Sequence, residues 1–275
     1  MSSILTNNSA MVALQTLKSV NTNLAKTQDM ISTGKDIATA KDNSAIFAIS
    51  KVMESDVSGF KAVSDSLSLG ESTVAVASAG AEQITNLLNE IKEKVVAATG
   101  ENVDHTKISA DVTELTNQVN SIVSASQFNG ANLLNTAGGN ITVLSSLDRD
   151  AGGTVTASNI TVASVDFEAN LDLSDIDVSS ATAADGSLAN IETHIQTAVD
   201  GAAALGASAK RISDQNEFVG KVTDAIKSGI GSLVDADMEA ASAQLQALQV
   251  QQQLATQSLS IANQAPQAIL SLFRG

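Results

Sequence analysis

The sequence predicts a mainly α-helical protein: a long antiparallel helical rod or coiled coil with a small β-hairpin region, whose N- and C-terminal helices pair. Residues 240–273 carry no charged side chain, yet their apolar residues recur every three or four positions, which is the coiled-coil period. Pro266 is the one proline in 275 residues, so helices are rarely interrupted. Aromatic residues make up 2% of the chain, and cores of long helices need few of them.

The first element is a helix that mirrors the charge-free C-terminal segment. Residues 1–25 contain a single charge, Lys18. Asn8 or Ser9 is expected to cap this helix, because their side chains accept hydrogen bonds from first-turn N–H groups. The helix is expected to end at Gly34. Its apolar positions follow a spacing of three and four residues, with polar Asn21 and Gln28 between them: Ala10, Leu14, Leu17, Leu24 and Ile31.

Two further helices are predicted over residues 44–98 and 106–126, each with one apolar face. Gly59, Gly70 and Gly80 lie within the first of them. Each glycine disfavours a helix by about 1 kcal/mol relative to alanine. The three glycines therefore indicate either close helix contacts or a break near Gly70.

Residues 140–178 are β-like, with two runs of β-branched residues around a turn-rich stretch at 148–153. A fourth long helix is predicted over residues 187–230, ended by Gly229 and Gly231. The terminal segment then forms a helix about 50 Å long, at ~1.5 Å per residue. Its predicted seam alternates steps of four and three residues: Ala241, Leu245, Leu248, Gln252, Ala255, Leu259, Ala262, Pro266, Ile269 and Phe273.

The composition excludes several classes of function. The net charge of −15 disfavours a nucleic-acid partner, which needs clustered Lys and Arg. The many Gln and Ser residues of the terminal segment exclude a membrane span. The two histidines stand apart, and no cysteine or phosphate-binding motif is present. We therefore expect no catalytic, cofactor-binding or metal-binding residues, no cofactor, and no enzymatic activity.

Four motifs, in order along nearly the whole chain, resemble those of bacterial flagellins, specifically the short kind common in alphaproteobacteria. Residues 31–50 are similar to the family's "L-x-T-G-x-x-I-x-x-A-x-D-x-x-A-x-x-A-I-S" signature. Residues 127–130 resemble its Gln-Phe-Asn-Gly helix-end motif. Residues 235–239 and 261–274 resemble its C-terminal motifs.

The resemblance implies a domain organisation and a function. Residues 1–43 and 233–275 are expected to form the inner coiled-coil domain. Residues 44–232 are expected to form the helical rod domain, with a β-hairpin at about 140–180 and no large outer domains. The implied function is a structural subunit that polymerises into the bacterial flagellar filament for swimming motility.

The resemblance also implies partners and a location. The partners would be many copies of the same chain, the flagellar export apparatus, an export chaperone, the filament cap and hook-associated proteins. No nucleic acid or membrane partner is expected. The protein would be secreted to the extracellular flagellum without a cleavable signal peptide, because residues 1–5 show no basic and apolar leader pattern.

The charge-free ends suit self-assembly, because stacked identical segments bury no like charges. We predict that residues 1–35 and 240–275 are disordered in the isolated subunit and become helical on assembly. The dense Gln face is expected to line the lumen or neighbouring subunits. Asp42 and Asn43 are predicted to cap helices at the junction of the two domains. The predicted assembly seam comprises Leu14, Leu17, Leu24, Ile31, Leu245, Leu248, Leu259, Ile269 and Phe273.

Two alternatives remain open from the sequence. A hook–filament junction protein of the same assembly shares the end motifs, although such proteins tend to be longer. A membrane-active secretion translocator would need a wide apolar face and basic flanks, and the Gln-rich segment lacks both.

Overall fold

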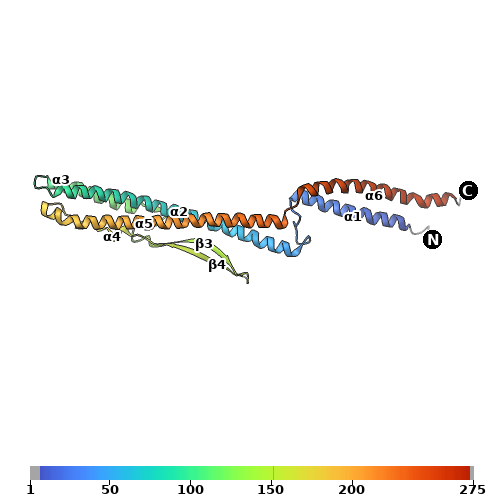
Figure 1. Cartoon of the computed structure of the whole chain (residues 1–275), viewed down its shortest axis with the longest axis horizontal. Helices are drawn as coiled ribbons and strands as arrows, with labels where there is room; N and C mark the ends of the chain where they lie inside the picture. Colours follow the sequence, from blue (N-terminus) through green and yellow to red (C-terminus); the bar gives the residue numbers. More distant parts are fainter. Residues whose placement is uncertain (1–6, 151, 273–275) are drawn as a thin grey trace. The chain divides into compact units, whose positions relative to one another are not determined.

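The computed structural model describes residues 7–150 and 152–272, with side chains up to Gln264 in the last helix. Helices dominate it, and the predicted mainly α class is confirmed (Figure 1). The chain forms two compact units. One contains residues 1–55 and 225–275, and the other contains residues 56–224.

The first unit contains the helix pair α1 (Asn8–Thr33) and α6 (Met238–Leu272). Figure 1 shows the two helices side by side. They run antiparallel, because Asn7 near the start of α1 meets Ala262, whereas Gly34 at its end meets Ala236. The predicted pairing of the terminal helices is therefore confirmed.

The second unit is built on residues 56–98 of α2 (Ser44–Ala98) and residues 181–224 of α5 (Ala181–Val234), which also run antiparallel. Ser64 bonds to Asn216 near one end, and Lys92 pairs with Glu192 near the other. Helix α3 (His105–Ala125) adds a third apolar face, and Asp104 caps its first turn. The hydrophobic core of buried residues runs from Val63 to Val219 and lies wholly within this unit.

The β structure is smaller than the sequence predicts. Strands β3 (Ile141–Arg149) and β4 (Val155–Val162) form an antiparallel hairpin with a register shift between Leu144 and Ser146. After Val162 the chain is no longer β, although the sequence predicts β structure to about Val178. It forms the short helix α4 (Phe167–Asn170) and a 3₁₀ turn, Leu173–Asp175, because Asp166 and Asp172 cap these turns.

A second hairpin, β1 (Gln127–Phe128) with β2 (Ala131–Asn132), forms where the sequence predicts only the end of a helix. Asn129 and Gly130 both have positive φ, 49° and 85°, as a tight two-residue hairpin turn requires. An Asn-Gly pair is a strong hairpin signal, so this turn could have been predicted.

Helix α2 continues through all three of its glycines. A Cβ at Gly59 would lie 2.7 Å from Leu147, at Gly70 2.5 Å from Val143, and at Gly80 2.3 Å from Ser126. The glycines therefore mark close contacts with β3 and with the end of α3, and no break occurs at Gly70.

Helix α5 extends beyond Gly229 and Gly231, where the sequence predicts its end. It stops at Val234, which is buried and whose carbonyl accepts hydrogen bonds from the N–H groups of Asp36 and Ile37. A tertiary contact therefore sets this helix end.

Candidate assembly surface

The seam between α1 and α6 is built from small and aliphatic side chains at coiled-coil spacing. On α6 the least exposed positions step by four and three residues through Ala241, Leu245, Leu248, Gln252, Ala255, Leu259 and Ala262. These are the positions at which the sequence places the seam. On α1 the facing positions are Ala10, Ala13, Leu17, Val20, Leu24, Thr27 and Ile31.

The predicted seam residues do not all lie between the two helices. Leu14 is 58% exposed, because positions 13, 20 and 27, and not 14, 21 and 28, continue the α1 repeat. Ile269 lies in α6, but its side chain falls outside the described part, and Phe273 lies outside the described residues. The role of every predicted seam residue in assembly stays a prediction.

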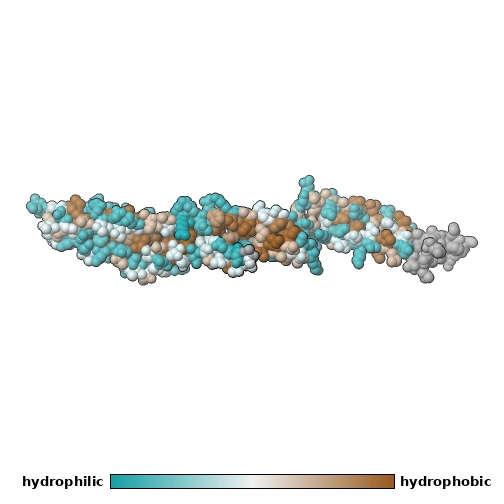
Figure 2. Space-filling view, turned by 60° about the horizontal axis from the view of Figure 1, so that its bottom comes forward, coloured by the Kyte–Doolittle hydropathy of each residue, from teal (hydrophilic) through white to brown (hydrophobic). Residues whose placement is uncertain are grey.

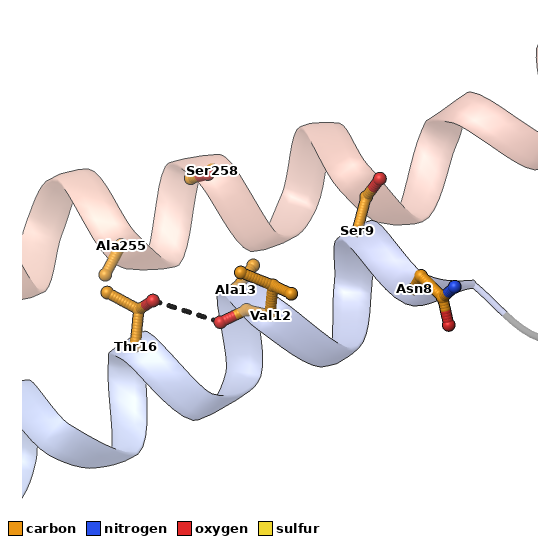
Figure 3. Close-up of a pocket in the computed structure, with 7 residues that line it drawn as sticks. All are labelled: Asn8, Ser9, Val12, Ala13, Thr16, Ala255 and Ser258. Atoms are coloured by element: carbon orange, nitrogen blue, oxygen red, sulfur yellow. Dashed lines mark hydrogen bonds between the residues drawn. The ribbon is translucent and has the colours of Figure 1, made fainter.

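Because several residues at the seam are small or polar, their side chains leave part of the space between the two helices open. Near the start of α1, Ala13 and Thr16 face Ala255 of α6 across an open hollow that also reaches Ser258 (Figure 3). The Thr16 hydroxyl donates to the Val12 carbonyl of its own helix at 3.0 Å, so it makes no bond across the seam.

Two side-chain amides form hydrogen bonds between the two helices. The Gln252 side-chain N–H donates to the Asn21 oxygen at 2.8 Å, and the Asn7 side-chain N–H donates to the Ala262 carbonyl at 2.8 Å. Asn7 also caps α1 by accepting from the Ala10 N–H. The predicted caps, Asn8 and Ser9, are wrong because the helix begins at Asn8.

Backbone hydrogen bonds hold the end of α1 beside the start of α6. Lys35 and Asp235 form an antiparallel bridge, with Asp36 N–H donating to Val234 and Ala236 N–H donating to Gly34. Gly34 ends α1 with a φ of 70°. That left-handed conformation suits glycine.

The two junction residues have distinct roles here. Asn43 caps α2, because its side-chain oxygen accepts from the N–H groups of Ala45 and Ile46 at 3.1 and 3.2 Å. Asp42 instead closes a turn by accepting from the backbone N–H and the hydroxyl of Thr39, both at 3.0 Å. A part in subunit contacts stays a prediction for both.

The hydrogen bonds from Thr39 lower the pKa of the Asp42 carboxyl. A carboxyl whose folded-state pKa is lowered adds stability above its unfolded-state pKa. The Thr39–Asp42 turn is therefore held at neutral pH and is weakened as the pH falls through the lowered pKa.

The first unit leaves much apolar surface uncovered, which the seam prediction did not anticipate. On α6 the most exposed large apolar side chains are Val250, Leu254 and Ile261, at 55%, 60% and 64% exposure. On α1 the equivalent exposed side chains are Met11, Val12 and Leu14. Figure 2 shows hydrophobic surface along this unit.

Other kinds of site find little support in the part of the chain that the structure describes. There, no cluster of three or more His, Asp or Glu side chains is placed to hold a metal ion. Among the described helices, none is both long and apolar enough to cross a membrane. His194 bonds to Asp175 at 3.0 Å, and His105 bonds to the Val178 carbonyl at 3.1 Å. Both histidines therefore attach the segment that follows β4 to a helix, His105 to α3 and His194 to α5.

Because the seam buries few apolar side chains, we predict that the terminal helices have low local stability. In the first unit the buried apolar residues are few, whereas the second unit holds a continuous core. Segments with few buried contacts open most readily. In a dilute subunit we expect amides of α1 and α6 to exchange at least about 100-fold faster than those of the core part of α2.

The measurement is hydrogen exchange followed by mass spectrometry on dilute and on polymerised protein. Polymerised protein should protect both terminal helices. Equal protection of α1, α6 and α2 in the dilute subunit would contradict this prediction and the disorder predicted from the sequence.

Comparison with known proteins identifies relatives over the whole chain. Residues 4–138 match the model of the bacterial flagellin N-terminal helical region, and residues 188–273 match that of the C-terminal helical region. Flagellin FljM of Caulobacter vibrioides is 40% identical over all of this chain and 99% of its own length. A flagellin of Brucella melitensis is 42% identical over the full length of both chains. Flagellin C of Rhizobium meliloti is 37% identical, also over the full length of both.

Proposed function

The chain belongs to the bacterial flagellin family and is a structural subunit of the flagellar filament used for swimming; from this premise we propose that its paired terminal helices form the inner domain of the filament. Residues 1–43 and 233–275 would make up this domain, and residues 44–232 the rod domain. The helix breaks between Gly34 and Asn43 and between Val234 and Met238 lie close to these boundaries, whereas the two compact units divide within α2 and α5, after Ser55 and before Ala225.

The observation that carries the proposal is the charge-free seam of α1 and α6. Residues 240–272 contain no ionised side chain, so many copies can pack together without burying like charges. The same helices bury few residues within one chain. Their packing is therefore completed by other copies.

Other features of the biology follow from the family alone. We propose that the chain passes through the flagellar export apparatus with an export chaperone. It would meet the filament cap and hook-associated proteins at the filament ends. We assign it no catalytic role, since flagellins are structural proteins. The hook–filament junction alternative is not favoured, because the relatives match as flagellins over their full length.

Leu248→Asp tests the seam. Leu248 is 6% exposed, and removing a buried leucine costs at least ~2 kcal/mol before any cost of the charge. We expect the concentration needed for seeded filament growth to rise at least about 30-fold. Leu259 is a half-buried seam position further along α6. Leu259→Asp should also raise the concentration needed for growth.

Growth is measured by sedimentation and electron microscopy after adding filament seeds. Gln249→Asp adds the same charge at an exposed neighbour and should grow normally. Far-UV circular dichroism should show that the second unit of Leu248→Asp still folds. Normal filaments from Leu248→Asp would contradict the seam, and failure of the unmodified protein to grow on seeds would contradict the proposed function.

A further inference from the structure

The turn between β1 and β2 holds the one Asn-Gly pair in the sequence, Asn129–Gly130. Both residues are exposed. Their positive φ values and the two-residue loop between Phe128 and Ala131 define a type I′ turn. An asparagine that precedes glycine is chemically labile, because glycine has no side chain to shield its amide nitrogen from the neighbouring side-chain amide.

The reaction open to this pair is the loss of ammonia from the asparagine. The Gly130 amide nitrogen attacks Cγ of Asn129, a new C–N bond forms, and the bond from Cγ to Nδ2 breaks. Ammonia leaves with the proton that the Gly130 nitrogen gives up, and a five-membered imide remains. Water then opens the imide at either carbonyl. Opening at Cγ gives aspartate, and opening at the backbone carbonyl gives isoaspartate, in which the chain runs through the former side chain.

The folded turn keeps the two reacting atoms apart. Ring closure needs the Gly130 nitrogen on the same side of the Cα–C bond of Asn129 as Cβ. In a type I′ turn, the mirror image of type I, ψ of the first central residue is about +30°. That angle directs the Gly130 nitrogen toward the backbone nitrogen of Asn129 and away from its Cβ. The pairing of Phe128 with Ala131 must therefore open before the ring can close.

We propose that Asn129 is a deamidation site that the β1–β2 turn protects in the folded subunit and that reacts when the turn opens. Asn129 thereby records the time that a subunit has spent unfolded. The inference goes beyond the proposed function and is independent of it, because the reaction and its protection both lie within one chain.

The isoaspartate product does not fit the hairpin. It adds one methylene group to the backbone between the two strands, so the pairing of Gln127 with Asn132 loses its register. Asn132 is buried, its side-chain N–H donates to the Val123 carbonyl at 2.7 Å, and its side-chain oxygen accepts from the Leu134 N–H at 2.8 Å. A longer turn would therefore displace buried residues. The aspartate product, by contrast, suits the same turn.

The first test compares native with denatured protein. The full-length protein is incubated at mildly alkaline pH with and without guanidinium chloride, and its peptides are followed by mass spectrometry. Asn129 should deamidate at least about 10-fold more slowly in the native protein, which corresponds to a turn-opening free energy of at least about 1.4 kcal/mol. The control is Asn159, which is exposed but is followed by the bulky Ile160, and should react slowly in both samples. Equal rates at Asn129 with and without denaturant would overturn the proposal, as would a rate in denaturant no faster than that of Asn159.

The second test follows the products back into the folded state. Protein aged in denaturant is returned to native buffer and treated briefly with protease, which digests open chains first. Isoaspartate, detected by enzymatic methylation of its free carboxyl group, should be depleted at least about 10-fold from the surviving chains, whereas aspartate at position 129 should survive.

Asn129→Gly is the matched control, because a Gly-Gly pair also forms a type I′ turn but cannot form the imide. After the same ageing it should resist protease as well as the fresh variant does. Full retention of isoaspartate in the surviving chains, or an equal loss of resistance in aged Asn129→Gly, would refute the protected site.

Discussion

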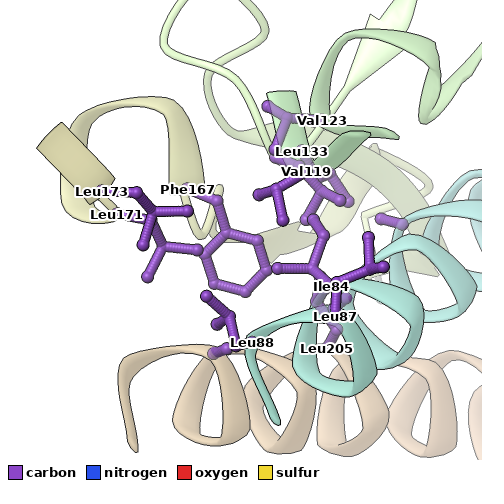
Figure 4. Close-up of a cluster of buried hydrophobic side chains, with 14 of the residues drawn as sticks. Ile84, Leu87, Leu88, Val119, Val123, Leu133, Phe167, Leu171, Leu173 and Leu205 are labelled. Atoms are coloured by element: carbon purple, nitrogen blue, oxygen red, sulfur yellow. The ribbon is translucent and has the colours of Figure 1, made fainter. Parts of the chain in front are cut away.

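Replacing Phe167 with alanine is expected to lower the free energy of unfolding of the second unit by about 3–5 kcal/mol. Phe167 is 1% exposed. Figure 4 shows its ring directed into the cluster that contains Leu88, Leu171 and Leu173. The ring is the buried anchor of the short helix α4, whose other attachments are hydrogen bonds such as that from the Glu168 N–H to the Leu134 carbonyl. The cavity left by alanine would therefore lie beneath an entire segment.

The effect is measured by denaturant unfolding of the dilute full-length protein, followed by far-UV circular dichroism. Phe218→Ala is the matched control, because Phe218 is 58% exposed on α5 and its loss should change stability by less than about 0.5 kcal/mol. A loss of stability for Phe167→Ala no larger than that of Phe218→Ala would show that α4 is not anchored in the core.

Gly70→Ala is expected to destabilise the same unit by about 1–3 kcal/mol, although alanine favours an exposed helix by about 1 kcal/mol over glycine. The added Cβ would lie 2.5 and 2.9 Å from the two methyl carbons of Val143. Valine is stiff at χ1, and Val143 is itself 4% exposed on β3. The hairpin must therefore move away from α2.

Gly220→Ala is expected to have the opposite effect on stability. A Cβ at Gly220 has no neighbour within 4 Å, so the variant should gain roughly 0.5–1 kcal/mol from its helix propensity. The two substitutions are compared by thermal and denaturant unfolding. An increase in stability for both would show that β3 does not pack closely on α2.

Long periodic elements could be predicted well from the sequence. The bounds of α2 agree with the predicted range, and α3 differs by one residue at each end. Every α6 position that the sequence places in the seam, as far as Ala262, is among the least exposed of its helix. Heptad spacing fixes these positions because one helix face must be covered whatever the partner is.

The α1 seam was harder to place. Leu14 is a larger apolar residue than Ala13, and apolar size favours it as a seam residue. The structure instead selects Ala13, Val20 and Thr27, because the seam must pass close to small residues of α6 such as Ala255. The choice between two neighbouring helix faces depends on the facing helix, and a single segment does not contain that information.

The sequence by itself determined the mainly α class, the pairing of the two ends, the charge-free seam of α6 and the family. These features follow from periodicity and composition, which are local and repeat over many residues. Only the tertiary structure decided which α1 face meets α6, where α5 ends, that α4 replaces the expected β structure, and which apolar side chains stay uncovered. Each of these depends on contacts between residues far apart in the chain, such as Val234 with Asp36 and Gly70 with Val143, and packing at such contacts overrides local preference.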